Sequence, residues 1–500
     1  NRPAVKLDGG ALTLNGASYA TTVPQTFGPL TVGSGFSTVT STRNGGTPEL
    51  VFNSLTSSKG SHVNFTGSSL GATSSAARVR FENVPAQTGG GGAAGSTTMS
   101  VITGARSGND WVTYDALTGI RPLAVTEYNN LAANDMNTAG ATDNVRVTNA
   151  VVSAYVPLTA DKTINSLVIN VASNTTWTPT NKLTLASGQL LSGVSNTTVA
   201  VNYPSTLTAG SGSDASLDVS VIQNITTIRS LVCNNGGGKV TLTKNGPGQL
   251  TLDASVDNTY SGGTYVNEGV LATGGAAGRR YLGTGPVRVD AAQLTLGQAG
   301  ATANASGFDY TGVNGAEIGG MSAPYWTDDT FYIGPGSVIY GTSSMGSGLN
   351  TLDRGIGAPG ATPNIVLAPD AIVAHNFSLS APLNLAAQTV RNLGTNTDLF
   401  YGLVTDQASA AGSITVGSNT AFKGVSTDRY DRRWAAGTIN VAPGTSEIWL
   451  QGMIRPGNTP GTLYMGNWLI DGGPVIAPAD AGPLTVNVNG AVVLDDNFAT

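Results

Sequence analysis

The sequence predicts an all-β protein whose short strands stack as successive coils of a solenoid. Runs of alternating apolar and polar residues occur at 249–252, 264–266 and 287–289, and glycine, asparagine or aspartate bounds each run. This alternation places Leu250 and Leu252 on one face of a strand and Thr251 on the other. Strands this short cannot each bury a face alone, but they can when they stack as coils. No long stretch has a period of 3.6 residues, so we expect very little helix.

Length and composition agree with a solenoid better than with one globular core. A chain of 500 residues exceeds the size of a normal single core, whereas each coil of a solenoid contacts only its neighbours. Charged residues make up 11% of the chain, well below the roughly 25% of ordinary soluble proteins, and glycine contributes 67 residues. This composition suits flat, exposed β faces in a cell-surface or secreted protein, and it argues against a cytosolic helical enzyme.

The charge and hydropathy of the chain argue against nucleic-acid binding and against a membrane-spanning helix. The net charge is −6 and the lysines and arginines are scattered, so we expect no nucleic-acid binding. No run of about 18 apolar residues occurs, which predicts no transmembrane segment in this portion. The chain opens on Asn1 without a signal peptide and ends on Thr500, and both ends resemble cuts through a longer polypeptide. The missing signal peptide is therefore no evidence for a cytoplasmic location.

Residues 244–296 carry a recognisable pattern: K-x-G-x-G-x-L-x-L, then N-x-Y-x-G-G-T-x-V, then G-x-L. The matching positions are Lys244, Gly246, Gly248, Leu250, Leu252, Asn258, Tyr260, Gly262, Gly263, Thr264, Val266, Gly269 and Leu271. The stretch resembles the autotransporter-associated β-strand repeat of large bacterial surface proteins. The resemblance implies a right-handed parallel β-helix passenger, extracellular and associated with the bacterial outer membrane. It implies no catalytic residues and no cofactor, because the signature positions of the family are structural.

Taken in order, the chain divides into solenoid coils and loop insertions. We expect coils at 1–109 with a glycine-rich loop near 87–98, an aromatic insertion at 110–144, coils at 145–300, an aromatic glycine-rich insertion at 301–364, and coils at 365–500 that continue beyond this segment. Exposed aromatic side chains favour interfaces, so the aromatic residues are the predicted contact surface. The candidates are Trp111, Tyr114, Tyr128, Tyr325, Trp326 and Trp434.

Motifs for catalysis and for metal binding are weak. The G-x-S-x-G match at 67–71 needs a helix after it, and none is evident in so glycine- and serine-rich a chain. His62 and His375 have no carboxylate at ligand spacing, so each is expected to be a hydrogen-bonded or exposed residue of a coil and not a metal ligand. We therefore predict neither catalytic nor metal-binding residues. Asn196, Asn202 and Asn245 are candidates for asparagine ladders that stabilise stacked coils.

The sequence therefore favours a structural or adhesive segment of a large bacterial surface protein, one that can form a fibre or surface layer. Its expected partners are further copies of the chain or the rest of a longer chain, and surface glycans or the surfaces of host or neighbouring cells. Two alternatives stay open. One is a carbohydrate-active β-helix enzyme, a polysaccharide lyase or hydrolase, that uses Asp328 and Asp329 or the cluster of Asp428, Asp431 and Arg432. The other is a passive spacer that carries a distal adhesin.

Overall fold

The computed structural model describes residues 2–296, with gaps at 17–23, 132–134, 149–155, 171–174, 178–180, 194–197, 202–204 and 275–278. Beyond residue 296 it describes 309–321, 330–334, 337–342 and the strands between 355 and 493 that are given below. The chain divides into two compact units. Unit 1 comprises 1–273, 280–286 and 290–292, and unit 2 comprises 274–279, 287–289 and 293–500.

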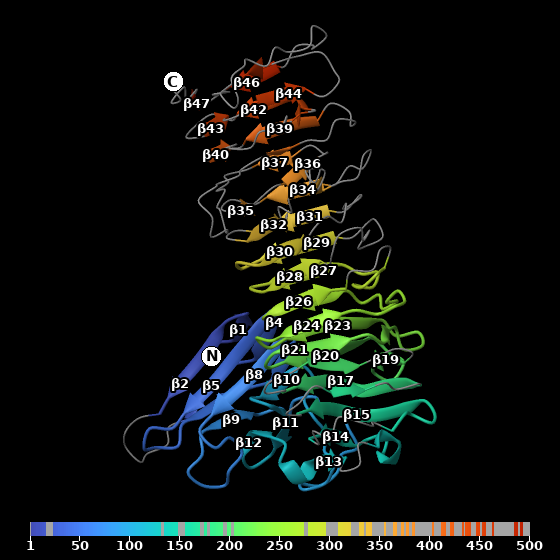
Figure 1. The fold of residues 1–500 in the computed structure, drawn as a ribbon. Coiled ribbons are helices and arrows are strands. Elements are labelled where there is room, and N and C mark those ends of the chain that lie inside the picture. The colour runs from blue at the N-terminus through green and yellow to red at the C-terminus, as the bar shows by residue number, and fades with distance from the viewer. Residues whose placement is uncertain are drawn as a thin grey trace. The chain divides into compact units, whose positions relative to one another are not determined.

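Unit 1 begins with an N-terminal stack of nine strands arranged as three coils. The strands are β1 (Val5–Asp8), β2 (Ala11–Asn15), β3 (Pro24–Thr26), β4 (Leu30–Ser34), β5 (Phe36–Thr42), β6 (Glu49–Phe52), β7 (Leu55–Ser57), β8 (His62–Gly67) and β9 (Arg78–Phe81). Each coil adds one strand to each of three parallel sheets, in the orders β1-β4-β7, β2-β5-β8 and β3-β6-β9 (Figure 1). Stacking buries alternate residues of strands such as β4, β5, β8 and β9, as the period-two pattern predicts.

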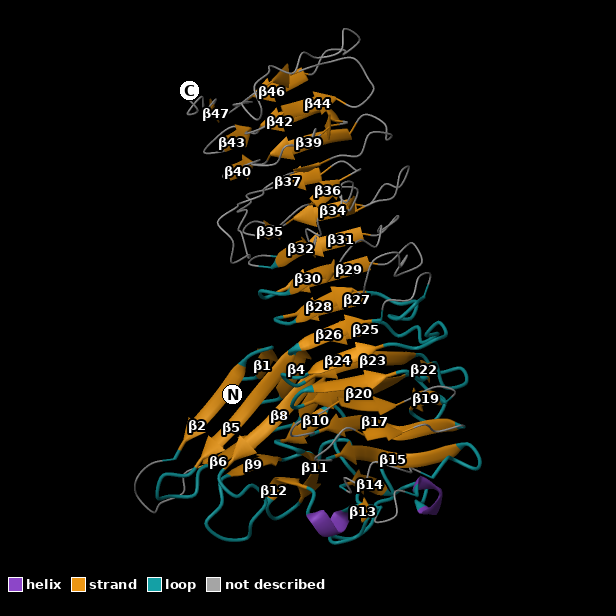
Figure 2. Ribbon diagram, in the orientation of Figure 1, coloured by secondary structure: helices purple, strands orange, loops and turns teal. Residues whose placement is uncertain are grey.

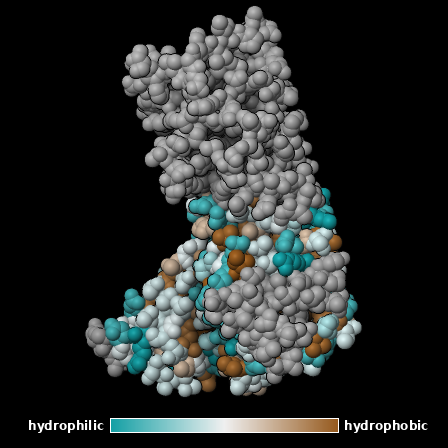
Figure 3. All heavy atoms as spheres, viewed as in Figure 1, coloured by the Kyte–Doolittle hydropathy of each residue, from teal (hydrophilic) through white to brown (hydrophobic). Residues whose placement is uncertain are grey.

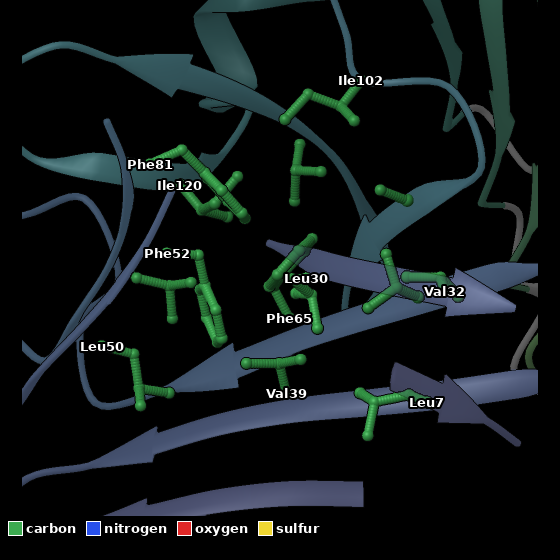
Figure 4. Packing of buried hydrophobic residues seen from close by; sticks show 14 residues of the cluster. Leu7, Leu30, Val32, Val39, Leu50, Phe52, Phe65, Phe81, Ile102 and Ile120 are labelled. Carbon is green, nitrogen blue, oxygen red and sulfur yellow. The ribbon is translucent and has the colours of Figure 1, made fainter. Parts of the chain in front are cut away.

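The N-terminal stack has a hydrophobic core of its own. Leu30 of β4, Val39 of β5, Phe52 of β6 and Phe65 of β8 are among its fully buried side chains, and Figure 4 shows them close together. All the residues of this core lie between Val5 and Ile120. Along β5 the threonines alternate toward the outside, and the face of the stack seen in Figure 3 is covered largely by side chains of intermediate hydropathy.

A hairpin and a cap follow the stack. The strands β10 (Ala105–Ser107), β11 (Asp110–Asp115) and β12 (Gly119–Pro122) extend the sheet of β8, with antiparallel pairing from β10 to β12. The cap then contains η1 (Val125–Glu127), β13 (Asn129–Asn130) and η2 (Met136–Thr138). These two short turns are the helical structure among the described residues (Figure 2).

The solenoid of unit 1 consists of parallel strands in two sheets. One sheet runs through β14 (Asn144–Val147), β15 (Lys162–Ile169), β17 (Lys182–Ser192), β19 (Thr206–Ala209), β20 (Ala215–Val221), β22 (Leu231–Val232), β23 (Val240–Asn245) and β25 (Thr264–Val266). The other runs through β16 (Thr175–Trp177), β18 (Thr198–Val201), β21 (Ile225–Ile228), β24 (Gln249–Leu252) and β26 (Val270–Thr273). The predicted all-β solenoid with very little helix is confirmed.

Unit 2 continues the same architecture. Its strands include β28 (Gln293–Leu296), β29 (Asp309–Val313), β30 (Glu317–Met321), β31 (Thr330–Ile333), β32 (Val338–Thr342), β33 (Gly355–Ile356), β34 (Asn364–Leu367), β35 (Ile372–Ala374), β36 (Phe377–Leu379), β37 (Leu383–Leu385), β38 (Leu403–Val404), β39 (Gly412–Val416) and β40 (Ala421–Gly424). After these come β41 (Arg433–Trp434), β42 (Ala436–Val441), β43 (Glu447–Leu450), β44 (Met453–Pro456), β45 (Leu463–Tyr464), β46 (Thr485–Val488) and β47 (Ala491–Val493). The strand β27 (Val287–Asp290) contributes residues to both units.

The structure differs from the expected insertion at 301–364. Within it, β29 pairs in parallel with β31, and β30 pairs in parallel with β32. Tyr310 of β29 and Ile333 of β31 are buried. The described parts of this segment are therefore coils, since their strands pair in parallel and Tyr310 faces the interior.

Candidate functional site

A column of buried polar side chains runs along one edge of the solenoid of unit 1, and we call it the polar seam. It consists of Asn144, Asn165, Gln189, Asp218, Asn245, Asn267 and Asp290, which lie on or directly after β14, β15, β17, β20, β23, β25 and β27. Each is less than 5% exposed. Buried polar groups require hydrogen-bond partners, so the partners of this column show what the seam does.

Several partners are backbone carbonyls of the N-terminal stack and of the residues that connect it to the cap. Asn144 donates to Met99 at 2.8 Å, Asn165 to Thr88 at 3.2 Å, Gln189 to Ile102 at 3.0 Å and to Ala105 at 3.2 Å, and Asn267 to Gly60 at 2.7 Å. Successive coils of the solenoid thus hold residues 60–105 through amide side chains. The glycine-rich loop near 87–98 takes part in this contact and lies against the solenoid.

The seam also joins a histidine to a carboxylate. Nδ1 of His62 in β8 lies 2.7 Å from Oδ2 of Asp218 in β20, and both side chains are buried. The imidazole stacks on Phe36 with ring centroids 5.6 Å apart. The other oxygen of Asp218 accepts a hydrogen bond of 2.8 Å from Nδ2 of Asn245. His62 is therefore hydrogen-bonded, as expected, but its partner belongs to the solenoid, 156 positions away.

Asn245 continues this network to the next coil. Its Oδ1 accepts a hydrogen bond of 2.9 Å from Nδ2 of Asn267. The predicted ladder role of Asn245 is thereby confirmed, and Asn196 and Asn202 lie outside the described residues. Asn245 both donates and accepts, so Asp218, Asn245 and Asn267 on three consecutive coils form one hydrogen-bonded chain that reaches His62 and Gly60 of the N-terminal stack.

Arg106 of β10 reaches the seam from the side of the N-terminal stack. Its guanidinium lies 5.0 Å from the centroid of the Phe36 ring, and Nη2 lies 3.8 Å from Oε2 of Glu268. Nη1 donates to the carbonyl of Gly108 at 2.8 Å. Burial lowers the pKa of Arg106, and the charges of Glu268 and Asp218 oppose that effect.

Lys244, a signature position of the repeat, is fully buried next to the seam. Its Nζ donates to the carbonyls of Asn245 at 3.0 Å, Gly246 at 2.6 Å and Glu268 at 2.9 Å. In turn, Oε2 of the Glu268 side chain accepts a hydrogen bond of 3.0 Å from the backbone N–H of Gly246. Burial lowers the pKa of Lys244 to about 7, with Glu268 acting to raise it and Arg106 to lower it. The lysine joins the corners of two consecutive coils.

The glycines of the repeat build these corners. Gly246 has φ +80 and Gly269 has φ +67, a region that favours glycine. A Cβ on Gly269 would lie 2.5 Å from the carbonyl oxygen of Gly246 in the coil below, so no larger residue fits. The signature glycines therefore allow the backbones of stacked corners to approach closely.

The remaining repeat positions form the interior. Leu250, Leu252, Val266 and Leu271 are each 0% exposed, in agreement with the period-two pattern. Tyr260 is also fully buried, and its hydroxyl lies 2.7 Å from Oγ1 of Thr264. Asn258 accepts from the N–H of Val232 at 2.8 Å and donates to the carbonyl of Tyr281 at 2.6 Å, which ties three coils together.

Two of the aromatic residues predicted as a contact surface are buried instead. Trp111 is 0% and Tyr128 2% exposed, and they pack with Val168 and Leu191 at the end of the solenoid. Arg146 stacks on Tyr128 with its guanidinium carbon 3.9 Å from the ring centroid. The prediction fails for these two because they close the open end of a solenoid, which requires large apolar side chains.

The other candidates are placed differently. Tyr114 is half-buried, and its hydroxyl donates to the carbonyl of Phe81 at 2.6 Å. Tyr325 and Trp326 lie outside the described residues, as do Asp328, Asp329, Asp428, Asp431, Arg432 and His375. The backbone of Trp434 forms part of β41. The structure thus brings Trp111 and Tyr128 together in one buried cluster.

The described residues contain no arrangement that resembles a metal site or a nucleophile elbow. Among them, no three His, Cys, Asp or Glu side chains gather closely enough to hold a metal ion. The G-x-S-x-G segment at 67–71 is followed by turns, and Oγ of Ser68 accepts from the N–H of Arg43 at 3.1 Å. A helix long and apolar enough to span a membrane does not occur in the described part of the chain.

Parallel coils with glycines at their corners define unit 1 as a β-solenoid, and Lys244 joins two of these corners. The family model of the passenger-associated-transport-repeat matches residues 242–272, which confirms the predicted resemblance to an autotransporter passenger repeat. No curated protein and no solved structure matches the chain. The repeat and the fold together fit a segment of an autotransporter passenger, a secreted or surface-exposed protein.

Proposed function

We propose that this chain is a structural and adhesive segment of a bacterial surface protein, without enzymatic activity. The observation that carries the proposal is the repeat at 242–272, whose signature residues all serve stacking: glycines at corners, leucines inside and Lys244 between coils. Stacked coils form a rigid scaffold with large lateral faces, which suits display at a distance from the cell. The proposed location is the outer face of the bacterial outer membrane.

Self-association is the proposed mode of assembly, because the low charge of the chain offers little repulsion between flat β faces. Electron microscopy and sedimentation of the purified chain test it. Filaments, bundles or layers that grow with concentration support the proposal. Strictly monomeric particles over a wide concentration range would contradict assembly into a fibre. The passive spacer would then be the remaining interpretation.

Adhesion is tested separately, with beads that carry the purified chain and with arrays of surface glycans and intact cells. Binding that saturates and that soluble chain competes away supports an adhesive role, and its absence argues for the spacer. The same material is incubated with polysaccharides, together with the variants Asp328→Ala and Asp428→Ala. Turnover that depends on either carboxylate would replace this proposal with an enzymatic function.

A further inference from the structure

Asparagine followed by glycine occurs at six places in the chain. They are Asn15-Gly16, Asn44-Gly45, Asn235-Gly236, Asn245-Gly246, Asn314-Gly315 and Asn489-Gly490, of which the last lies outside the described residues. In such a pair the backbone nitrogen of the glycine can attack the side-chain amide carbon of the asparagine, because glycine has no side chain that hinders the approach. Two conditions control the attack. The glycine N–H must be free to lose its proton, and the asparagine side chain must be free to turn toward it.

The pair at Asn245 meets neither condition. The side chain of Asn245 is fully buried and both of its polar atoms are held, Nδ2 by Asp218 at 2.8 Å and Oδ1 by Asn267 at 2.9 Å. The N–H of Gly246 donates to Oε2 of Glu268 at 3.0 Å. Reaction at this pair therefore requires the corner of the repeat to open first, and local opening of a buried region costs free energy.

Three further pairs are each restrained by a hydrogen bond. The N–H of Gly16 donates to the carbonyl of Thr42 at 2.7 Å, and Nδ2 of Asn235 donates to the carbonyl of Gly210 at 2.7 Å. The pair Asn314-Gly315 lies within a turn that a backbone hydrogen bond of 3.1 Å closes. Each of these bonds restricts either the glycine N–H or the conformation of the asparagine, so we expect slow reaction at all three.

Asn44 has different surroundings. It lies in the bend between β5 and β6, and both Asn44 and Gly45 are exposed. Among the described residues, no hydrogen bond involves the side chain of Asn44 or the N–H of Gly45. The guanidinium of Arg43 donates to the carbonyl of Gly45 at 3.1 Å. A cation so close stabilises the negative charge that the amide nitrogen of Gly45 carries once it has lost its proton.

We propose that Asn44 is a site of spontaneous deamidation, for which solvent water is the co-reactant. The nitrogen of Gly45 attacks Cγ of Asn44 and the bond from Cγ to Nδ2 breaks. Ammonia leaves with the proton that the Gly45 amide has given up through water, and a cyclic succinimide remains. Water then opens this ring at either carbonyl, which yields aspartate or isoaspartate. Both products place a carboxylate beside Arg43, and isoaspartate also lengthens the backbone of the bend.

The test follows deamidation of the purified full chain at pH 8. Samples taken over time are digested in mild acid, which suppresses further reaction. Mass spectrometry of the peptides distinguishes acid from amide, and chromatography separates aspartate from isoaspartate. We expect the rate at Asn44 to exceed the rate at Asn245 by at least about tenfold, because Asn245 reacts only after local opening. A rate at Asn44 no higher than that at Asn245 overturns the proposal.

The unfolded chain is the matched control. In urea at the same pH the hydrogen bonds that hold Asn245 are lost, so its rate should approach that of Asn44. A difference between the two sites that persists in urea means that local sequence selects the site, and it overturns the structural account. The variant Asn44→Gln checks the assignment, because its longer side chain forms the ring far less readily. If its peptide still gains acid at the wild-type rate, a neighbouring amide reacts and the proposal is wrong.

Discussion

Nδ1 of His62 lies 2.7 Å from Oδ2 of Asp218, although 156 positions separate the two residues in the chain. This contact joins the second-last strand of the N-terminal stack to the middle of the solenoid. Together with the bond from Asn267 to Gly60, it makes the first hundred residues a lateral attachment of the solenoid and not merely its first coils. Asn267 lies within the repeat at 242–272, whereas Asp218 lies in an earlier coil of the solenoid.

Replacement of Lys244 by methionine should destabilise the solenoid. The variant keeps most of the volume but leaves the carbonyls of Asn245, Gly246 and Glu268 without their donor. A buried polar group that loses its hydrogen-bond partner costs about 1–3 kcal/mol of stability, and less where the corner relaxes. Denaturant unfolding gives the total, and hydrogen exchange at 244–269 gives its location. Lys239→Met, at an exposed position of the same segment, should stay within about 0.5 kcal/mol of the wild type. Equal losses of unfolding free energy in both variants would contradict the role of Lys244 in joining the two corners.

The pKa of Lys244 predicts a pH dependence with a definite sign. The folded value is about 7 and the ordinary value is 10.5, so the unfolded chain binds more protons between these limits. The stability contribution of Lys244 therefore rises from about pH 7 to about pH 10.5 and is lost as the pH falls toward 7. The measurement is the difference in unfolding free energy between the wild type and Lys244→Met at pH 7, 8, 9 and 10. A difference that stays constant or falls with pH would show that the lysine remains charged in the fold.

Gly269→Ala should destabilise the corner of the repeat. An alanine at φ +67 is strained, and its Cβ would lie 2.5 Å from the oxygen of Gly246. We expect a loss of more than about 1 kcal/mol, with local loss of hydrogen-exchange protection. The control is Gly237→Ala, because a Cβ at Gly237 meets nothing within 4 Å. Equal stability of the two variants would show that stacking does not require the glycine.

Leu252→Ala should remove stability from the interior near the repeat. The side chain is 0% exposed, and truncation of a buried leucine typically costs about 2–5 kcal/mol. In a solenoid the loss should remain near the affected coils, which residue-resolved hydrogen exchange detects. Thr251→Ala changes the half-buried neighbour on the opposite face and should cost less. If hydrogen-exchange protection near residue 252 is the same in Leu252→Ala as in the wild type, this leucine does not belong to the core.

The sequence predicts the interior of the repeat well because strand periodicity assigns faces locally. Leu250, Leu252, Val266 and Leu271 follow from alternation and are all buried. The burial of Lys244 does not follow, because lysine is rarely buried and only the stacked carbonyls compensate for it. Sequence spacing carries no signal for the pairing of His62 with Asp218, which depends on the path of the whole chain.

Aromatic residues show the other limit of sequence reasoning. Trp111 and Tyr128 are equally consistent with an exposed contact surface and with a buried plug, because composition does not report what covers a side chain. Trp111 belongs to the hairpin strand β11 and packs with Tyr128 against Val168 and Leu191 of the solenoid. A useful signal is their position between two runs of coils, directly before the strands that begin at β14, where a cap is required.

A double-mutant cycle of His62→Phe and Asp218→Asn tests the lateral attachment most directly. The unfolding free energies of the wild type, both single variants and the double variant give the coupling energy of the pair. The account predicts a coupling of about 1.5–3 kcal/mol at neutral pH, the range of hydrogen bonds to charged groups. A coupling indistinguishable from zero would mean that the two side chains do not meet, and that the N-terminal stack does not dock on the solenoid through the polar seam.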